Sequence, residues 1–167
     1  MAIFPGRYTA QTDEPFVVFL IGMRVNRAFA VGKWIPVARA MPAMIAELMK
    51  QPELGFLHAE TVLYWRGVAV IQYWRSFEHL HAYAHMKDRN HLPAWAEFNR
   101  RVGNNGAVGI WHETFMVLPG NHEAIYVNMP RFGLAAAANH VPAVGRMETA
   151  RSRMQRADNA QSNPAGK

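Results

Sequence analysis

The chain of 167 residues contains no cysteine, which excludes disulfide bonds, thiolate metal ligands and a cysteine nucleophile. It also lacks a long hydrophobic run, since the longest, residues 16–23, is far too short to cross a bilayer as a helix. The N-terminus lacks the basic region, the apolar core and the cleavage site of a signal peptide. We therefore expect a cytoplasmic protein without a membrane partner. The sequence has no glycine-rich phosphate loop, serine-centred elbow or carboxylate pair, so nucleotide binding and serine hydrolysis are not indicated.

Positive charge is in excess, but much of it lies at one end of the chain. The formal net charge is +6, and residues 145–167 carry five basic residues against two acidic ones. That segment is poor in apolar residues and rich in Arg, Asn, Gln and Ser, a composition typical of disorder. We therefore expect one domain over residues 1–144 and a basic, disordered tail over 145–167. The charge left on the domain does not favour a nucleic-acid partner.

Apolar patterning predicts strands and helices in alternation. Residues 16–25 are β-branched, aromatic and almost continuously apolar, which predicts a strand covered on both faces. Residues 34–51 have helical spacing, although Pro42 should kink or split that helix. Two further strands, 57–65 and 68–76, are joined by a tight turn.

The second half of the pattern begins at Ser76, a plausible N-cap for a helix that starts at about residue 77. A second helical piece follows, and then two more strands, giving the expected ranges 91–102, 108–118 and 123–129. Residues 1–15 are expected to be an irregular lead-in, and residues 133–145 a short helix or an arm.

The predicted order β-α-β-β-α-β is that of an α+β, ferredoxin-like fold, with one antiparallel sheet and both helices on one face. Residues 16–25 and 68–74 are nevertheless apolar on both sides. Because helices cover only one face, the other face needs a partner. We therefore expect a homodimer in which two sheets face each other as a dimeric α/β barrel.

Two histidines fall among apolar neighbours. On the predicted helix, His91 shares a face with Trp95, Phe98 and Val102. On the predicted strand, alternation places His112 with Ile110, Thr114 and Met116. A histidine on an apolar face is more often a hydrogen-bonded core residue than a ligand, so spacing alone leaves both interpretations open. The pair His81 and His85, four residues apart, could hold a divalent metal but has no evident third ligand.

Several segments resemble the dimeric α/β-barrel superfamily, namely WRSFEHL, NHLPAWAEF, IWHETFMV and EAIYVNMPRFGL. Within it, the chain is most similar to small bacterial proteins of the monooxygenase family that carry a domain of unknown function, DUF4188. The earlier segments FLIGMRVNR, KWIPVARAMPAMIAEL and PELGFL resemble those proteins as well. The resemblance covers most of residues 14–135 and implies the ferredoxin-like fold and an enzyme acting on a small organic substrate.

A more distant resemblance is to the haem-containing aldoxime dehydratases. It implies haem b, with His91 as the iron ligand and His112 as the distal catalytic residue. Trp95, Phe98 and Met116 would line the haem slot, and His85 is the reserve iron ligand. The chain is much shorter than those enzymes, and the serine and arginine that assist oxime binding there have no match in it.

Three functions are therefore compatible with the sequence. The first is a haem b enzyme with lyase chemistry of the aldoxime dehydratase kind, or with monooxygenase or peroxidase chemistry, at the open iron face. The second is a cofactor-independent monooxygenase of the same fold, in which His112 serves as a base. The third is a non-enzymatic binder of haem or a small ligand.

Overall fold

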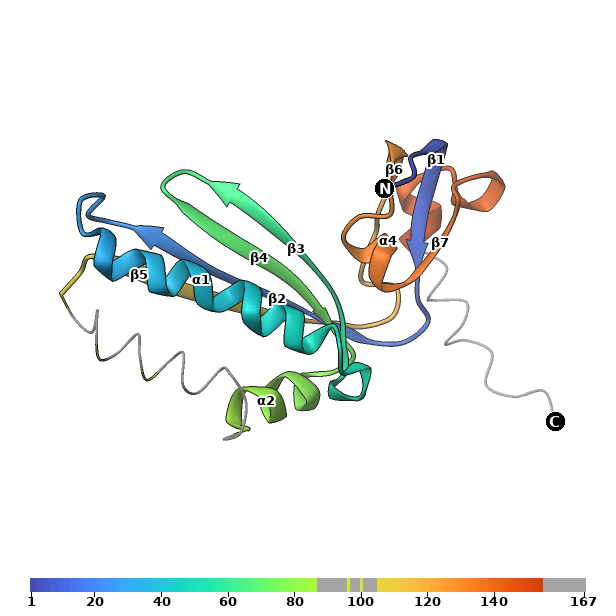
Figure 1. The fold of residues 1–167 in the computed structure, drawn as a ribbon. Coiled ribbons are helices and arrows are strands. Elements are labelled where there is room, and N and C mark those ends of the chain that lie inside the picture. The colour runs from blue at the N-terminus through green and yellow to red at the C-terminus, as the bar shows by residue number, and fades with distance from the viewer. Residues whose placement is uncertain (87–95, 97–99, 101–104, 155–167) are drawn as a thin grey trace. The chain divides into compact units, whose positions relative to one another are not determined.

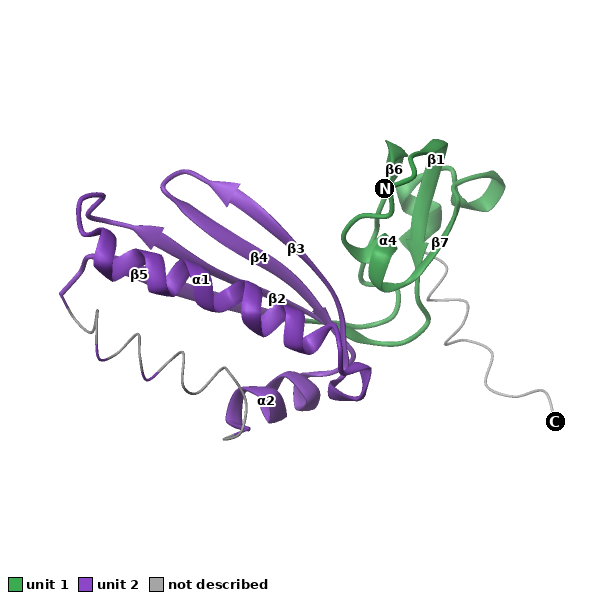
Figure 2. Ribbon diagram, in the orientation of Figure 1, with its two compact units in different colours: residues 1–16, 116–167 green, residues 17–115 purple. Residues whose placement is uncertain are grey.

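The computed structural model describes residues 1–86, 96, 100 and 105–154, and the structural statements below concern these residues. The chain divides into two compact units (Figure 2): residues 17–115, and residues 1–16 together with 116–167. Among the described residues, no helix combines the length and the hydropathy needed to cross a membrane.

The unit of residues 17–115 is built on a four-stranded sheet with the strand order β3-β4-β2-β5 (Figure 1). Its elements are β2 (Phe16–Val25), α1 (Val31–Leu48), η1 (Pro52–Leu54), β3 (Phe56–Tyr64), β4 (Gly67–Trp74), α2 (Phe77–His85) and β5 (Val108–Val117). Strand β4 pairs antiparallel with both β2 and β3. The predicted α+β ferredoxin-like fold is confirmed.

The hairpin between β3 and β4 forms where the sequence predicts it. Tyr64 is paired with Gly67, and Arg66 adopts the left-handed conformation with a φ of 59°. A Cβ atom at Gly67 would lie 2.1 Å from the carbonyl oxygen of Met23, so only glycine fits where β4 meets β2. A turn of this kind closes locally, which explains why the sequence reveals it.

Helix α2 begins as the sequence predicts, whereas α1 differs from its prediction. The Ser76 hydroxyl oxygen accepts a hydrogen bond from the His79 amide at 3.4 Å, which confirms the predicted N-cap of α2. Helix α1 contains both Pro36 and Pro42 and continues through them to Leu48, so the expected split does not occur. The two prolines remove two backbone hydrogen bonds from α1, and the helix is anchored at its C-terminal end by Leu48 in the core.

The core of this unit lies where the C-terminal end of α1 and the start of α2 meet the sheet. Its centre is Trp74, which is 0% exposed and whose indole N–H donates to Gln72 Oε1 at 2.9 Å. The Trp74 ring contacts Phe56 edge-on, with centroids 5.3 Å apart, and lies 5.8 Å from the Tyr83 ring. The other buried members of the cluster are Val17, Leu48, Leu54 and Leu80.

The second unit contains a three-stranded sheet in the order β6-β1-β7, so the prediction of an irregular lead-in is wrong. Its elements are β1 (Phe4–Gln11), β6 (Tyr126–Met129), α4 (Leu134–Ala137) and β7 (Asn139–Pro142). Strand β1 pairs with partners more than a hundred residues away, and the Thr9 hydroxyl donates to the Ala124 carbonyl at 2.8 Å. Pairing at such a distance leaves little local signal in the sequence.

An aromatic cluster covers part of this small sheet. The His140 ring is stacked on Tyr8, with centroids 4.5 Å apart, and meets Phe4 edge-on at 4.8 Å. Burial lowers the pKa of His140 below its usual value, and the nearby charge of Arg131 adds to the effect. His140 is therefore packed here as a neutral aromatic ring.

The beginning of the basic tail contacts the same unit. Residues 145–147 form the 3-10 turn η2, and residues 150–154 are helical. Arg153 Nε donates to Glu123 Oε1 at 2.8 Å, and Arg153 also donates to the Met147 carbonyl at 2.7 Å. Residues 155–167 lie outside the described residues, so disorder there stays a prediction.

Candidate active site

A pocket of about 870 Å³ lies between α1 and the sheet, within the unit of residues 17–115. This volume falls in the range of roughly 300–1,000 Å³ that is usual for sites that bind small organic molecules. Most of its walls are apolar. The apolar lining includes Phe19, Ile21, Met23, Val37, Met41, Met44, Ile45, Val68, Val70, Leu80 and Ile110.

The polar groups that reach this pocket are few among the described residues. They are Lys33 on α1, Thr61 on β3, His81 on α2, and His112 and Thr114 on β5. Sparse polar groups in an apolar cavity fix the orientation of a ligand, while the apolar walls supply most of its binding energy. The pocket therefore suits a largely apolar molecule with one or two polar atoms.

Strand alternation directs the His112 side chain into this pocket. Ile110, His112 and Thr114 all line the cavity, as the alternation in the sequence predicts. The His112 ring lies 5.6 Å from the Phe19 ring of the neighbouring strand, at a tilt of 44°. A histidine fixed to a strand beside an aromatic ring is well placed to act on a bound molecule.

His81 and His85 have a different arrangement on α2. Their rings are stacked with centroids 4.1 Å apart, and His85 Nδ1 lies 2.8 Å from the His81 carbonyl oxygen. A carbonyl oxygen only accepts, so His85 Nδ1 carries the hydrogen and its Nε2 is an acceptor. His81 lines the pocket, whereas His85 does not. Within the described ranges, no group of three His, Asp or Glu side chains is arranged to hold a metal ion.

Of the other residues of the predicted site, the structure describes only Met116 and His85, and neither lines the pocket. His91, Trp95 and Phe98 lie outside the described residues, so the structure does not place them. Met116, predicted to line a haem slot, is 73% exposed and does not line the pocket. Sequence reasoning did not predict that Met41 and Met44 of α1 line the pocket. Their helical stripe of flexible methionines was the available signal.

The opposite face of the sheet carries its own aromatic cluster. Trp111 lies across Gly22, where a Cβ atom would come within 2.7 Å of the indole. The Trp111 indole N–H donates to the Tyr64 hydroxyl at 2.9 Å, and that hydroxyl donates to the Met23 carbonyl at 2.8 Å. This face also exposes Phe115, on the same side of β5 as Trp111, so it remains partly apolar.

Comparison with known proteins places residues 16–134 in the family described as monooxygenase af470-like. A curated relative, monooxygenase af470 of Aspergillus fumigatus, is 31% identical over 144 residues, covering 76% of this chain and 49% of the relative. The chain thus spans about half the length of that relative.

Solved structures with a similar fold share less of the sequence. SnoaB of Streptomyces nogalater, described as a cofactor-independent oxygenase, is 16% identical with a TM-score of 0.43, over 60% of this chain and 90% of SnoaB. A dimeric ferredoxin-like protein of unknown function from Bacteroides fragilis is 12% identical with a TM-score of 0.44, over 60% of this chain and 95% of that protein.

These findings correct the cofactor prediction. The matching family is described as one of monooxygenases, and nothing in that description calls for haem. The prediction of haem b is therefore wrong. The iron-ligand roles predicted for His91 and, in reserve, His85 depended on that cofactor, and His91 lies outside the described residues. The similarity to aldoxime dehydratases, from which haem and lyase chemistry were inferred, is not shown.

Proposed function

The chain belongs to the monooxygenase af470-like family, and on this basis we propose that it is a cofactor-independent oxygenase that binds a small apolar substrate in the pocket beneath α1. The observation that carries the proposal is the position of His112, an imidazole on the wall of a mostly apolar cavity of about 870 Å³. The apolar walls would hold the substrate, and the solvent-exposed His112 would exchange a proton with it and with water.

The chemistry requires that the substrate supply the electrons, because no redox cofactor takes part in this proposal. A base removes a proton from a C–H group that is acidic because its carbanion is conjugated with a carbonyl, and this carbanion reduces O₂. When a CH₂ group becomes C=O, one oxygen atom enters the product and the other leaves as water with the two hydrogens. His112 is proposed to be the base that begins this sequence.

His112 suits this role better than His81, the other histidine of the pocket. The His112 ring is carried by a strand and lies beside Phe19, which would hold it in one orientation. The His81 ring is instead stacked on His85. Thr114, which shares the strand face with His112, would orient a substrate carbonyl by donating a hydrogen bond.

Oxygen consumption with anthrone tests the proposal, because this three-ring ketone has an acidic CH₂ group and is largely apolar. We expect the protein to form one anthraquinone per O₂ in the presence of a metal chelator and without added flavin. Ala84→Trp, which fills the pocket from α2, should lower kcat/KM at least about tenfold. Ala82→Trp, on the exposed side of the same helix, should leave it unchanged. Equal turnover by both variants would mean that the pocket is not the site.

We also propose that the protein is a homodimer formed through the sheet face opposite the pocket, which carries Trp111 and Phe115. Light scattering should give about twice the chain mass of 18.9 kDa. Ile71→Glu, on that face of the central strand β4, should shift the mass towards the monomer, because a buried unpaired carboxylate is costly. Met49→Glu, at an exposed position after α1, is the control. A monomer mass for the wild type at micromolar concentration would remove this proposal.

A further inference from the structure

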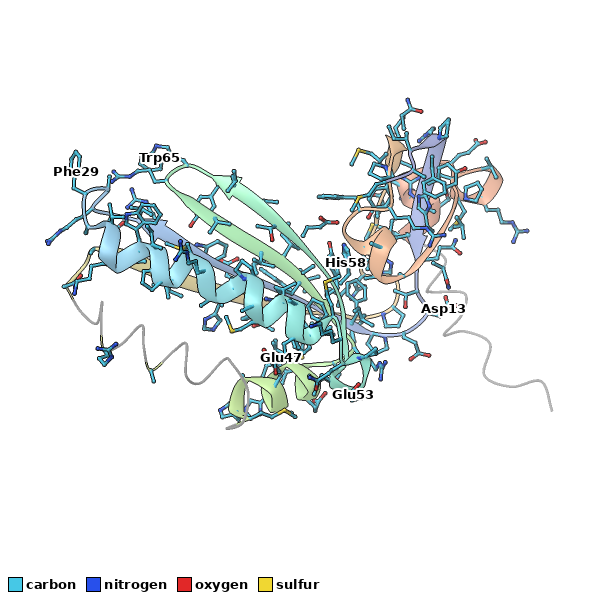
Figure 3. The ribbon with its side chains drawn as sticks, viewed as in Figure 1. Asp13, Phe29, Glu47, Glu53, His58 and Trp65 are labelled. Carbon is cyan, nitrogen blue, oxygen red and sulfur yellow. The ribbon has the colours of Figure 1, made fainter. Side chains whose placement is uncertain are left out.

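One end of the unit of residues 17–115 exposes large apolar side chains beside basic ones. Phe29 is 101% exposed, Leu63 87% and Trp65 73%. Figure 3 shows Phe29 and Trp65 at the same end of the unit. We call this surface the basic tip and define it by six residues: Arg24, Arg27, Phe29, Leu63, Trp65 and Arg66.

The basic tip is a structured surface, since its two segments are joined by hydrogen bonds. The Val25 amide donates to the Arg66 carbonyl at 2.7 Å, and the Arg66 guanidinium donates to the Asn26 carbonyl at 2.7 Å. The Arg24 guanidinium carbon lies 4.8 Å from the centre of the Trp65 ring, and that of Arg66 lies 5.9 Å away. Both cations therefore lie within cation–π distance of the exposed indole.

Charge is distributed unevenly along this unit. Residues 24–34 and 63–67 contain Arg24, Arg27, Lys33 and Arg66 and no acidic residue. Figure 3 shows Glu47 and Glu53 at the other end of α1, which at 1.5 Å per residue is about 27 Å long. The segments of the basic tip thus carry only positive charge, whereas the other end of α1 carries charges of both signs, and this difference favours contact of the tip with a negatively charged partner.

We propose that the basic tip docks the protein on the surface of an anionic lipid bilayer. Tryptophan and phenylalanine are the side chains that enter the boundary between head groups and acyl chains, and neighbouring arginines pair with lipid phosphates. A nucleic acid would use the arginines and stack on the rings, but it offers nothing to Leu63, an aliphatic side chain that is 87% exposed in the same hairpin as Trp65. The combination of an aliphatic side chain, aromatic rings and cations favours the bilayer.

The pocket begins next to the basic tip. Met23 and Lys33, which line the pocket, flank the loop that carries Arg27 and Phe29. A docked protein would present this end of the cavity to the bilayer, where apolar molecules accumulate. The docking proposal depends only on the residues of the basic tip. The further idea that docking helps the protein to collect a substrate rests on the proposed function.

Cosedimentation of the full chain with lipid vesicles tests the docking without any assay of turnover. We expect binding to phosphatidylcholine vesicles that contain phosphatidylglycerol, weaker binding at high salt, and little binding to phosphatidylcholine alone. Phe29→Ala combined with Trp65→Ala should lower the partition coefficient at least about tenfold. Val144→Ala, which truncates a side chain that is 66% exposed in the other unit, should not change it.

Charge and insertion are tested separately. Arg27→Gln should weaken vesicle binding, whereas Lys50→Gln, an equal loss of charge after the other end of α1, should have a smaller effect. Lipids brominated on their acyl chains should quench tryptophan fluorescence in the wild type and less in Trp65→Phe, which keeps an aromatic ring and should still bind.

Three outcomes would overturn the proposal. The first is no binding of the wild type to anionic vesicles. The second is binding to a single-stranded oligonucleotide without binding to vesicles, which would assign the basic tip to nucleic acid. The third is loss of the homodimer in the Phe29→Ala, Trp65→Ala variant, which would assign the tip to a second copy of the chain. If the wild-type protein binds vesicles but does not oxidise anthrone, only the proposed function is contradicted.

Discussion

Replacing His112 with alanine is expected to lower kcat for anthrone oxidation by about 10²- to 10⁴-fold, the usual contribution of a general base. KM should change little, because the apolar walls that bind the substrate remain in place. His112→Gln should lose as much activity as His112→Ala, since an amide keeps the hydrogen-bonding capacity but cannot take up the proton. The measurement is steady-state oxygen consumption, with the fold of each variant checked by circular dichroism.

His81→Ala is the matched control, because it removes the other imidazole of the same pocket. We expect a loss of less than about tenfold there, from altered packing alone. Comparable losses in the two variants would show that no single base carries the reaction. Full activity in His112→Ala would contradict the role proposed for this residue, while leaving the pocket as the binding site.

Replacing Trp74 with alanine should lower the free energy of unfolding by about 3–5 kcal/mol, the usual cost of truncating a buried aromatic side chain. The Trp74 side chain is fully buried, and its removal would leave a cavity between Phe56 and Tyr83. Gln72 Oε1, itself in a buried residue, would also lose the indole donor. Urea unfolding monitored by circular dichroism measures the change.

Trp65→Ala makes the same substitution at a side chain that is 73% exposed and should change the free energy of unfolding by less than about 0.5 kcal/mol. The difference between the two variants therefore isolates the effect of burial. Similar changes in both would mean that Trp74 does not occupy the centre of the core.

The sequence predicts those parts of the fold that are determined by neighbouring residues. The turn at Arg66 and Gly67 and the cap at Ser76 depend on a few adjacent residues, and both are present in the structure. Strand β1 depends on pairing with residues 126–129 and 139–142, and no local pattern reports such contacts. Helix α1 begins at Val31, three residues before the predicted start, because its first turn has no capping side chain to mark it.

For the candidate site, alternation was enough to place His112 in the pocket beside Ile110 and Thr114. It could not reveal that Met116, two residues beyond Thr114, fails to line the cavity. The haem prediction came from a resemblance at two histidines and not from any property of the surrounding residues. The close approach of Trp111 to Gly22 was also beyond the sequence, because it depends on the register between β2 and β5.

Helix α1 forms the outer wall of the pocket and contains two prolines that line it, Pro36 and Pro42. Neither has an amide hydrogen, so the carbonyl groups of Gly32 and Ala38 lack the usual donor four residues further along. A helix with fewer backbone bonds unfolds locally at a lower free-energy cost than a regular one. Ligand entry can then proceed by transient opening of this wall, and the association rate would follow the frequency of opening rather than the diffusion of the ligand.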